Sequence, residues 1–444
     1  MCNTPGEKIK FKIESHSEYI SGLCSSTLHI ANTPLTGRRL KQRLFSYTST
    51  TYHFIRTSYP SLLIGGCGSG RSRALLGMLE QNFSSREPFV YMNGKGDTSS
   101  VAMLYAAAKN AGVQDDLYVI NGYALDASVT HTFDPINPLV GDLQSFEAVF
   151  GKNAGKMLNE QCEIFHKQGL LIDFDVLETL LDLTSLKTLA LNADMPRPFL
   201  VEYLKSLGNR VKAEIKRHGE NMEKAKSLIA TLKTMPMCSF DPDLDLKSIF
   251  LESKFLCVSL PALEKDPDRL QVIEDLFLCQ LSRALPENYL SSANPSFVID
   301  GGYTPSINCL EILNRFAHTR SVLGYEYLTD DKHKYAESYR TIAKMAQSVI
   351  LMKIEDQIPD FIKMNAFDNG ISRWNINVRD IVNQSPGHAT VWGNIATKNK
   401  GFLGGSRKFD VQAGIKRIEM KHFNPDMAGL DIQMTRIRIA KPVI

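Results

Sequence analysis

Residues 61–73 combine residue types that bind phosphate groups. Three apolar residues, Leu62, Leu63 and Ile64, lead into the run GGCGSGRS, and an apolar helical pattern starts at Ala74. The spacing matches the phosphate-binding loop (P-loop) G-x-x-x-x-G-K-[ST], with arginine in place of lysine. Glycines let the backbone turn so that its N–H groups surround phosphate oxygens at a helix N-terminus. The stretch predicts nucleotide binding; the alternative is a glycine-rich strand-to-helix turn without a ligand.

The P-loop positions have separate predicted roles. Ser72 is placed to hold Mg²⁺, and Arg71 to neutralise the outer phosphates. Arg71 presents a planar guanidinium, which is not equivalent to the compact ammonium of lysine at a tight phosphate site. The residues expected to contact the nucleotide are Gly65, Gly68, Ser69, Gly70, Arg71, Ser72 and Arg73.

A carboxylate follows a second apolar run. Residues 297–300 read as a strand that ends in Asp300, the Walker B position of P-loop enzymes, where it would help hold Mg²⁺. Asp300 could instead form a turn before Gly301 and Gly302. The residue after Asp300, where a glutamate would polarise the attacking water, is Gly301. Hydrolysis by the usual route is therefore doubtful, and no catalytic residue is assigned.

Strands and helices alternate around these motifs. Strands are predicted at 88–92, 117–121, 254–259, 321–325 and 348–352, and helices after the P-loop and over 101–111. This alternation predicts an α/β fold with a mainly parallel sheet, whose ligand site lies at the carboxyl ends of the strands. Alternating residues predict further strands in the first 60 residues, at 8–13 among them, and hairpins in the basic region 388–420.

The pattern changes between 142 and 245. Apolar residues recur there at helical spacing, with charged residues between them, which predicts an inserted all-α domain. The chain is thus divided into a first nucleotide-binding part (1–141), the all-α insertion (142–245) and a second nucleotide-binding part (246–444).

Composition narrows the class of protein. A net charge of +3 in 444 residues does not by itself establish nucleic-acid binding. Eight scattered cysteines without a C-x-x-C pair indicate reduced thiols and argue against a disulfide framework or a zinc site. Neither a signal peptide nor an apolar run of membrane-spanning length is found, so a soluble chain is expected. The histidines show no ligand spacing, which argues against a metal enzyme or a nucleophile triad.

Taken together, the motifs resemble the soluble ATPase part of type IV secretion coupling proteins of the TraG/TraD-like kind, and most closely the type IVB (Dot/Icm-type) branch. The resemblance covers about residues 60–395 in family order. It rests on the P-loop and on the segments NGKGD at 93–97, GVQDDL at 112–117, FDPINPL at 133–139, SLPALEK at 259–265 and KIED at 353–356.

The resemblance implies an FtsK/HerA-like RecA fold with an all-α domain inserted between sheet strands, and ATP with Mg²⁺ as cofactors. It also implies a ring-shaped oligomer, a hexamer in the family, that works with secretion or conjugation machinery. Such rings lie at the cytoplasmic face of the bacterial inner membrane and pass DNA or protein cargo to a secretion channel.

Several positions depart from the family pattern. Arg71 replaces the P-loop lysine and Gly301 the Walker B glutamate, while Tyr325-Glu326-Tyr327 stands where a GQD-like element is common and Ala346-Gln347 where Asn-Thr is usual. These changes predict weakened hydrolysis. Two alternatives stay open: an active translocation motor in which Glu326 or Asp97 supplies the catalytic carboxylate, and a nucleotide-free adaptor whose all-α insertion binds secretion substrates.

Overall fold

The computed structural model of the chain describes most of the region between residues 27 and 419. The described residues are 27–34, 50–56, 61–94, 98–122, 130–167, 169, 172–182, 198–260, 267–285, 295–301, 320–325, 346, 348–354, 381–399 and 410–419. Several predicted features lie outside these ranges: the strand at 8–13, Asp97, the segment 261–265, Gly302, Glu326, Tyr327, Gln347, Glu355 and Asp356.

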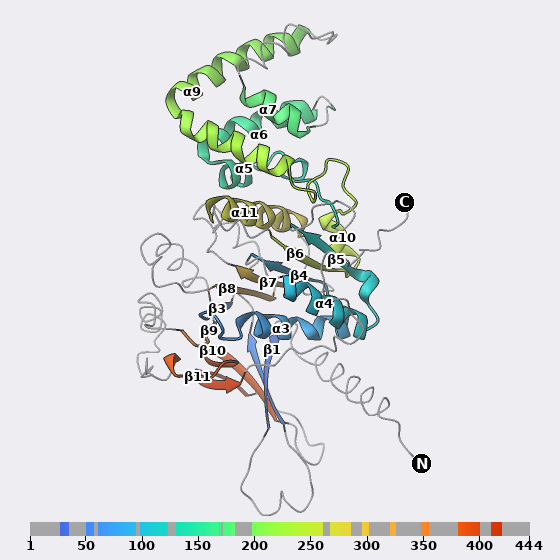
Figure 1. The fold of residues 1–444 in the computed structure, drawn as a ribbon, viewed down its shortest axis with the longest axis vertical. Helices are drawn as coiled ribbons and strands as arrows, with labels where there is room; N and C mark the ends of the chain where they lie inside the picture. The colour runs from blue at the N-terminus through green and yellow to red at the C-terminus, as the bar shows by residue number, and fades with distance from the viewer. Residues whose placement is uncertain are drawn as a thin grey trace, which may run out of the picture.

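An 11-stranded sheet organises the chain (Figure 1). The strand order is β1-β2-β10-β9-β3-β8-β7-β4-β6-β5, and β11 pairs with β10. All neighbouring pairs from β9 to β5 are parallel. The pairs among β1, β2, β10 and β11, and that between β10 and β9, are antiparallel. The predicted α/β fold with a mainly parallel sheet is confirmed.

The strands agree closely with the sequence patterns. They are β1 (Thr27–Pro34), β2 (Thr50–Arg56), β3 (Ser61–Ile64), β4 (Phe89–Asn93), β5 (Leu117–Asn121), β6 (Phe255–Ser259), β7 (Ser296–Gly301), β8 (Arg320–Tyr325), β9 (Ser348–Leu351), β10 (His388–Asn399) and β11 (Asp410–Glu419). The last two form the hairpin that the alternation after residue 388 predicts.

The parallel strands are buried on both faces, which is why they read as continuous apolar runs. Leu63 belongs to the cluster formed with α3 (Arg71–Ser85) and α4 (Thr98–Asn110). Its neighbours Leu62 and Ile64 point to the opposite face, into the cluster formed with α10 (Leu246–Leu251) and α11 (Pro267–Ala284). Side chains alternate along a strand, so the sheet is a middle layer between two helical layers. Figure 1 shows α11 on one side of the parallel strands and α3 and α4 on the other.

The described residues between β5 and β6 contain helices and no named strand. They comprise the short 3₁₀ helix η3 (Asn137–Leu139), α5 (Leu143–Phe150), α6 (Lys152–Lys167), α7 (Phe174–Leu181) and α9 (Pro198–Lys233), followed by α10. The side chains of Asp142 and Asp173 accept hydrogen bonds from the first-turn amides of α5 and α7. Such caps fix where a helix starts. The domain division at 141/142 and 245/246 stays a prediction.

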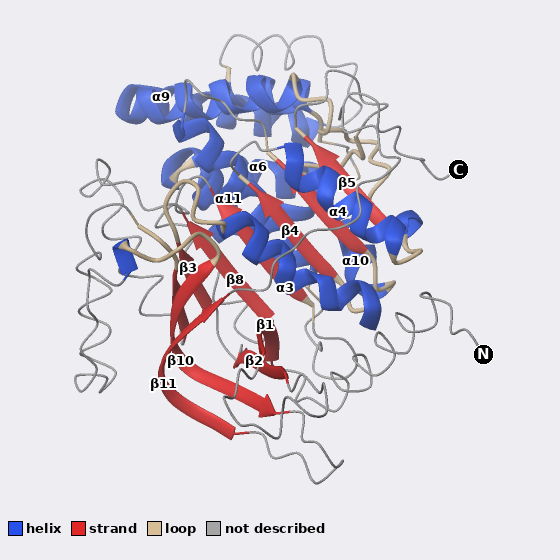
Figure 2. Cartoon of the chain, turned by 60° about the horizontal axis from the view of Figure 1, so that its bottom comes forward, coloured by secondary structure: helices blue, strands red, loops and turns tan. Residues whose placement is uncertain are grey.

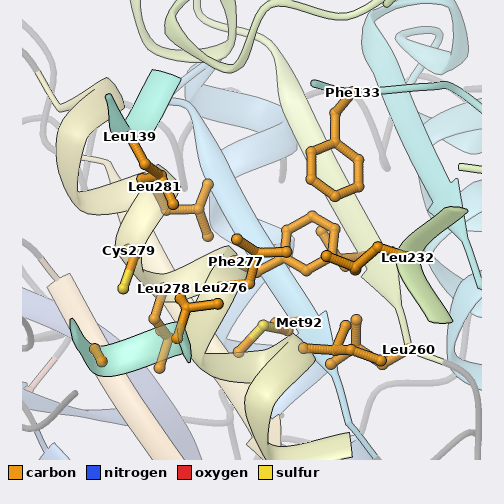
Figure 3. Packing of buried hydrophobic residues seen from close by; sticks show 14 of the residues in the cluster. Met92, Phe133, Leu139, Leu232, Leu260, Leu276, Phe277, Leu278, Cys279 and Leu281 are labelled. Carbon is orange, nitrogen blue, oxygen red and sulfur yellow. The ribbon is translucent and has the colours of Figure 1, made fainter. Parts of the chain in front are cut away.

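Helix α11 lies between the sheet and this helical block (Figure 1). The rings of Phe133 and Phe277 have centroids 4.5 Å apart. Figure 3 shows Met92 from β4 and Leu232 from α9 in the same cluster as Phe277. Because one apolar cluster continues from the sheet through α11 to α9, the helical block is packed onto the sheet rather than tethered beside it.

Among the described helices, none is both long enough and apolar enough to cross a bilayer.

Candidate nucleotide-binding site

The carboxyl ends of the central strands bring together residues that are far apart in the sequence. Asn93 at the end of β4 lies opposite Asp300 in β7, and the amide of Gly94 donates to the Asp300 carbonyl at 2.9 Å. The P-loop follows β3 at the same edge, where the amide of Gly66 donates to the Lys353 carbonyl at 2.9 Å. The P-loop and the Walker B strand that ends in Asp300, both predicted from the sequence, therefore lie at the same edge of the sheet.

The P-loop backbone needs glycine at defined points. Gly68 and Gly70 have φ angles of 70° and 88°, in the left-handed region that other residues rarely adopt. A Cβ atom on Gly65 would lie 2.5 Å from the hydroxyl oxygen of Ser69, so a larger residue would not fit at this position. Within the loop, the Ser69 amide donates to the Gly66 carbonyl at 3.2 Å. The glycine spacing of the motif is thus explained by this tight turn.

The N-terminus of α3 has the features of an anion-binding helix end. Helix α3 starts at Arg71, and its N-cap Gly70 supplies no side-chain hydrogen bond to the first turn. That first turn contains no acidic residue. First-turn amides have no acceptor within the helix, and the helix dipole places partial positive charge there. Both features favour a phosphate group at this point.

Arg71 is buried beneath the loop. Its side chain is about 2% exposed; Nε donates to Asp300 Oδ1 at 3.1 Å and Nη1 to the Gly65 carbonyl at 3.0 Å. The ion pair joins the first residue of α3 to the penultimate residue of β7. Sequence reasoning placed both residues at the site but did not predict that they contact each other.

Asp300 is fully buried and surrounded by donors. The Tyr91 hydroxyl donates to Oδ2 at 3.3 Å, and the Ser72 hydroxyl also bonds to the carboxyl group. Burial raises the pKa of Asp300 above its usual value, while the Arg71 charge and the hydrogen bonds from Ser72, Arg71 and Tyr91 oppose that rise. Of the influences that favour the charged carboxylate, the charge of Arg71 is the largest.

The remaining P-loop residues differ in exposure. Ser69 is buried, Ser72 is partly buried, and Gly68 and Arg73 are exposed. Cys67, between Gly66 and Gly68, is an exposed free thiol. The tip of the loop is thus accessible, while Arg71 and Ser69 form its floor.

Ser72 and Asp300 fit the chemistry of a magnesium site. Hydroxyl and carboxylate oxygens are hard ligands of the type that Mg²⁺ takes, together with phosphate oxygens and water. Because the two side chains are hydrogen-bonded to each other, their oxygen atoms lie close enough together to be ligands of one metal ion. The same carboxylate is already ion-paired with the Arg71 guanidinium. Asp300 therefore has two possible cationic partners.

The position after Asp300 contains no carboxylate. Gly301 is the last residue of β7, is buried, and lies opposite Tyr325 at the end of β8. Neither residue can polarise a water molecule as a glutamate would.

Sequence reasoning missed a buried carboxyl group on α11. Glu274 is fully buried, and within the described part of the chain neither of its carboxyl oxygens has a hydrogen-bond partner. Burial, followed by the nearby charges of Asp275 and Asp300, raises its pKa well above 4.5. A signal was present in the sequence: Glu274 occupies the position between Ile273 and Phe277 on the apolar stripe of the helix.

No family model matches the chain. In sequence, the chain is 24% identical over 275 residues to the type 4 coupling protein DotL of Legionella pneumophila. The aligned part covers 50% of this chain and 35% of that protein, so the chain spans well under half of that relative's length.

Solved structures of the plasmid coupling protein TrwB share the fold. Its complex with ADP and Mg²⁺ has a TM-score of 0.54 at 14% identity, covering 84% of this chain and 87% of TrwB. The complex with the GTP analogue GDPNP has a TM-score of 0.53 at 14% identity, covering 82% and 86%. The match in sequence and the common fold confirm the resemblance deduced from the motifs: this chain is similar in sequence to a type 4 coupling protein and has the fold of the coupling protein TrwB.

Proposed function

We propose that this chain is the nucleotide-binding core of a coupling-protein-like component of a type IV secretion or conjugation system. It binds ATP with Mg²⁺ at the P-loop and recruits or passes DNA or protein cargo. The observation that carries the proposal is the uncapped N-terminus of α3 next to Arg71, Ser72 and Asp300 at the carboxyl edge of a parallel sheet. The names of the relatives, DotL and TrwB, support the cellular role.

Hydrolysis is proposed to be weak. The position that should carry the water-polarising carboxylate is Gly301. Asp300 is itself neutralised by Arg71. Phosphoryl transfer depends on positioning the water and on stabilising charge, so losing the orienting group costs orders of magnitude in rate, roughly 10²-fold or more.

We further propose the assembly that relatives of this type suggest: a ring, with six copies as the starting model, at the cytoplasmic face of the bacterial inner membrane. Machinery proteins of the secretion or conjugation system would be its partners. The residues proposed to contact nucleotide remain Gly65, Gly68, Ser69, Gly70, Arg71, Ser72 and Arg73, with Ser72 and Asp300 toward the metal.

A second candidate function has one observation in its favour. The charge of Arg71 is already compensated by Asp300, as expected for a P-loop that stays empty. In that case the chain is a nucleotide-free adaptor, and the helical block between β5 and β6 binds the secretion substrate.

The deciding experiment is calorimetric titration with Mg·ATP, with phosphate release followed on the same sample. We expect binding with little turnover, and loss of binding in Arg71→Ala. The matched control is Arg86→Ala, because Arg86 lies exposed at the opposite end of α3. Turnover gained in Arg71→Lys would locate the defect in the P-loop. Robust wild-type turnover would contradict weak hydrolysis, and no binding at millimolar ATP would leave the adaptor.

A further inference from the structure

The guanidinium of Arg71 connects two parts of the site through two different nitrogen atoms. Nη1 donates to the first carbonyl of the P-loop, that of Gly65, at 3.0 Å. Nε donates to Asp300, 229 residues away, at 3.1 Å. The side chain therefore joins the P-loop to the Walker B strand across the floor of the site.

The Asp300 end of this contact is closed to solvent. Both side chains of the ion pair are almost completely buried, at 2% and 0% exposure. Oδ1 accepts from Arg71 and Oδ2 from Tyr91, and Ser72 bonds to the same carboxyl group. A divalent cation that approaches Asp300 must therefore compete with a cation that is already in place.

Breaking the Arg71–Asp300 ion pair is unfavourable when only the phosphate or only Mg²⁺ binds. If Arg71 turns to a phosphate, Asp300 is left as a buried anion beside further negative charge. If Mg²⁺ takes Asp300, Arg71 is left as a buried cation. A buried charge without a partner is strongly unfavourable, so both exchanges are favourable only when they occur together.

We propose that Arg71 and Mg²⁺ are alternative cations for Asp300. In the nucleotide-free chain Arg71 holds Asp300; when Mg·nucleotide binds, Arg71 transfers to the phosphates and the metal takes Asp300. Arg71 is in this sense a positioning residue that blocks the metal site until nucleotide is present. The inference rests on the proposed function, since it assigns the order of events at the same P-loop.

Arginine suits this exchange better than lysine does. Its guanidinium has donors on Nε and on both terminal nitrogens, so one side chain reaches Gly65 and Asp300 at once. Lysine has a single compact ammonium group on a flexible stem. Arg71→Lys therefore preserves the charge while it weakens the double contact.

The first test uses nucleotide-free protein and Mn²⁺ in place of Mg²⁺, with free Mn²⁺ measured by electron paramagnetic resonance. We expect wild type to bind Mn²⁺ weakly, and Arg71→Lys and Arg71→Ala to bind it at least about tenfold more tightly. Adding Asp300→Asn to either variant should remove that gain. The lysine variant keeps the test valid if the alanine variant fails to fold. Equal Mn²⁺ affinity in wild type and Arg71→Lys overturns the proposal.

The second test adds ATP and measures the magnesium concentration that gives half-maximal binding. We expect Arg71→Lys to need at least about tenfold less Mg²⁺ than wild type. The two hypotheses fail separately. If neither protein binds ATP while the Mn²⁺ result holds, the proposed function is wrong and the competition for Asp300 stands. If both bind ATP with the same magnesium requirement, nucleotide binding stands and the competition is wrong.

Discussion

The backbone amide of Gly387 donates a hydrogen bond to the carbonyl of Ser69, with 2.8 Å between the two atoms. The turn that precedes β10 therefore lies directly on the P-loop. Strand β10 continues from this turn along β9 and then along β2, while β11 pairs along most of it. Figure 2 shows these antiparallel strands extending from the parallel part of the sheet. The hydrogen bond from Gly387 thus links the backbone of the P-loop to the antiparallel part of the sheet.

This contact predicts different effects for two glycines of the same loop. Gly68 and Gly70 both have positive φ angles, but a Cβ atom on Gly70 would lie 3.2 Å from the amide nitrogen of Gly387, whereas one on Gly68 would meet nothing within 4 Å. We expect Gly68→Ala to lower the free energy of unfolding by about 1 kcal/mol through backbone strain, and Gly70→Ala by about 2–3 kcal/mol because the Gly387 contact is also disturbed. Urea unfolding measures both, and equal losses would contradict the contact.

The sequence was sufficient for the features that depend on local pattern. The run from Leu62 to Ser72 predicted a strand, a glycine turn and a helix, because backbone conformation at Gly68 and Gly70 is set by neighbouring residues. The strand ending in Asp300 was predicted for the same reason, since a buried parallel strand is a short apolar run.

Features that depend on distant contacts were not predicted. The Arg71–Asp300 pair joins residues 229 positions apart, and no local pattern records which donors reach a carboxylate. The Gly387 turn needed the order of strands in the sheet, in which β10 pairs with β9 beside β3. Glu274 was hidden for a different reason: the periodicity of α11 marks its position as buried, but composition favours reading a glutamate as solvent-exposed.

Cys67 provides a direct report on nucleotide binding. It is the exposed thiol of the P-loop, whereas Cys162 and Cys257 are buried and burial raises the pKa of the Cys162 thiol to about 12. We expect N-ethylmaleimide to label Cys67 rapidly and Mg·ATP to slow that labelling at least about tenfold at saturation, since the bound phosphates would cover the loop. Mass spectrometry of the peptide that contains Cys67 isolates this thiol from the others.

The control for this labelling is Cys162, whose rate should not respond to nucleotide. If Cys67 is labelled at the same rate at ATP concentrations that saturate calorimetric binding, the nucleotide lies elsewhere on the protein.

Glu274 predicts a pH dependence of stability. Its pKa is raised in the folded protein, mainly by burial, so the folded state holds a proton that the unfolded state releases near pH 4.5. As the pH rises above about 4.5, the unfolded state binds fewer protons than the folded state, and the free energy of unfolding falls by up to about 1.4 kcal/mol per pH unit until the folded pKa is passed. Glu274→Gln removes this fall in the free energy of unfolding, because the glutamine side chain does not titrate.

We therefore expect the stability gain of Glu274→Gln over wild type to grow between pH 5 and pH 8 in chemical unfolding. Glu220→Gln is the matched control, because Glu220 is 84% exposed and pairs with Lys224 on the surface of α9. Its difference from wild type should stay within about 0.5 kcal/mol at every pH. A constant gap between Glu274→Gln and wild type would mean that Glu274 is ionised in the folded protein.

Two helical glycines predict opposite effects in the helical block. A Cβ atom on Gly155 of α6 would clash with the carbonyl oxygen of Phe146 in α5, whereas one on Gly219 of α9 would meet nothing within 4 Å. We expect Gly155→Ala to lower the free energy of unfolding by about 2–4 kcal/mol, since the backbones of α5 and α6 must separate. Gly219→Ala should raise it by about 0.5–1 kcal/mol through helix propensity.

Thermal unfolding followed by circular dichroism at 222 nm distinguishes the two outcomes. Because α5 also packs against α11, and α11 shares its apolar cluster with the sheet, the loss in Gly155→Ala should lower the transition of the whole protein and not that of the helical block alone. An early separate transition in this variant would instead show that the block unfolds independently of the nucleotide-binding sheet. In that case the helices between β5 and β6 would form a unit that folds independently of the sheet.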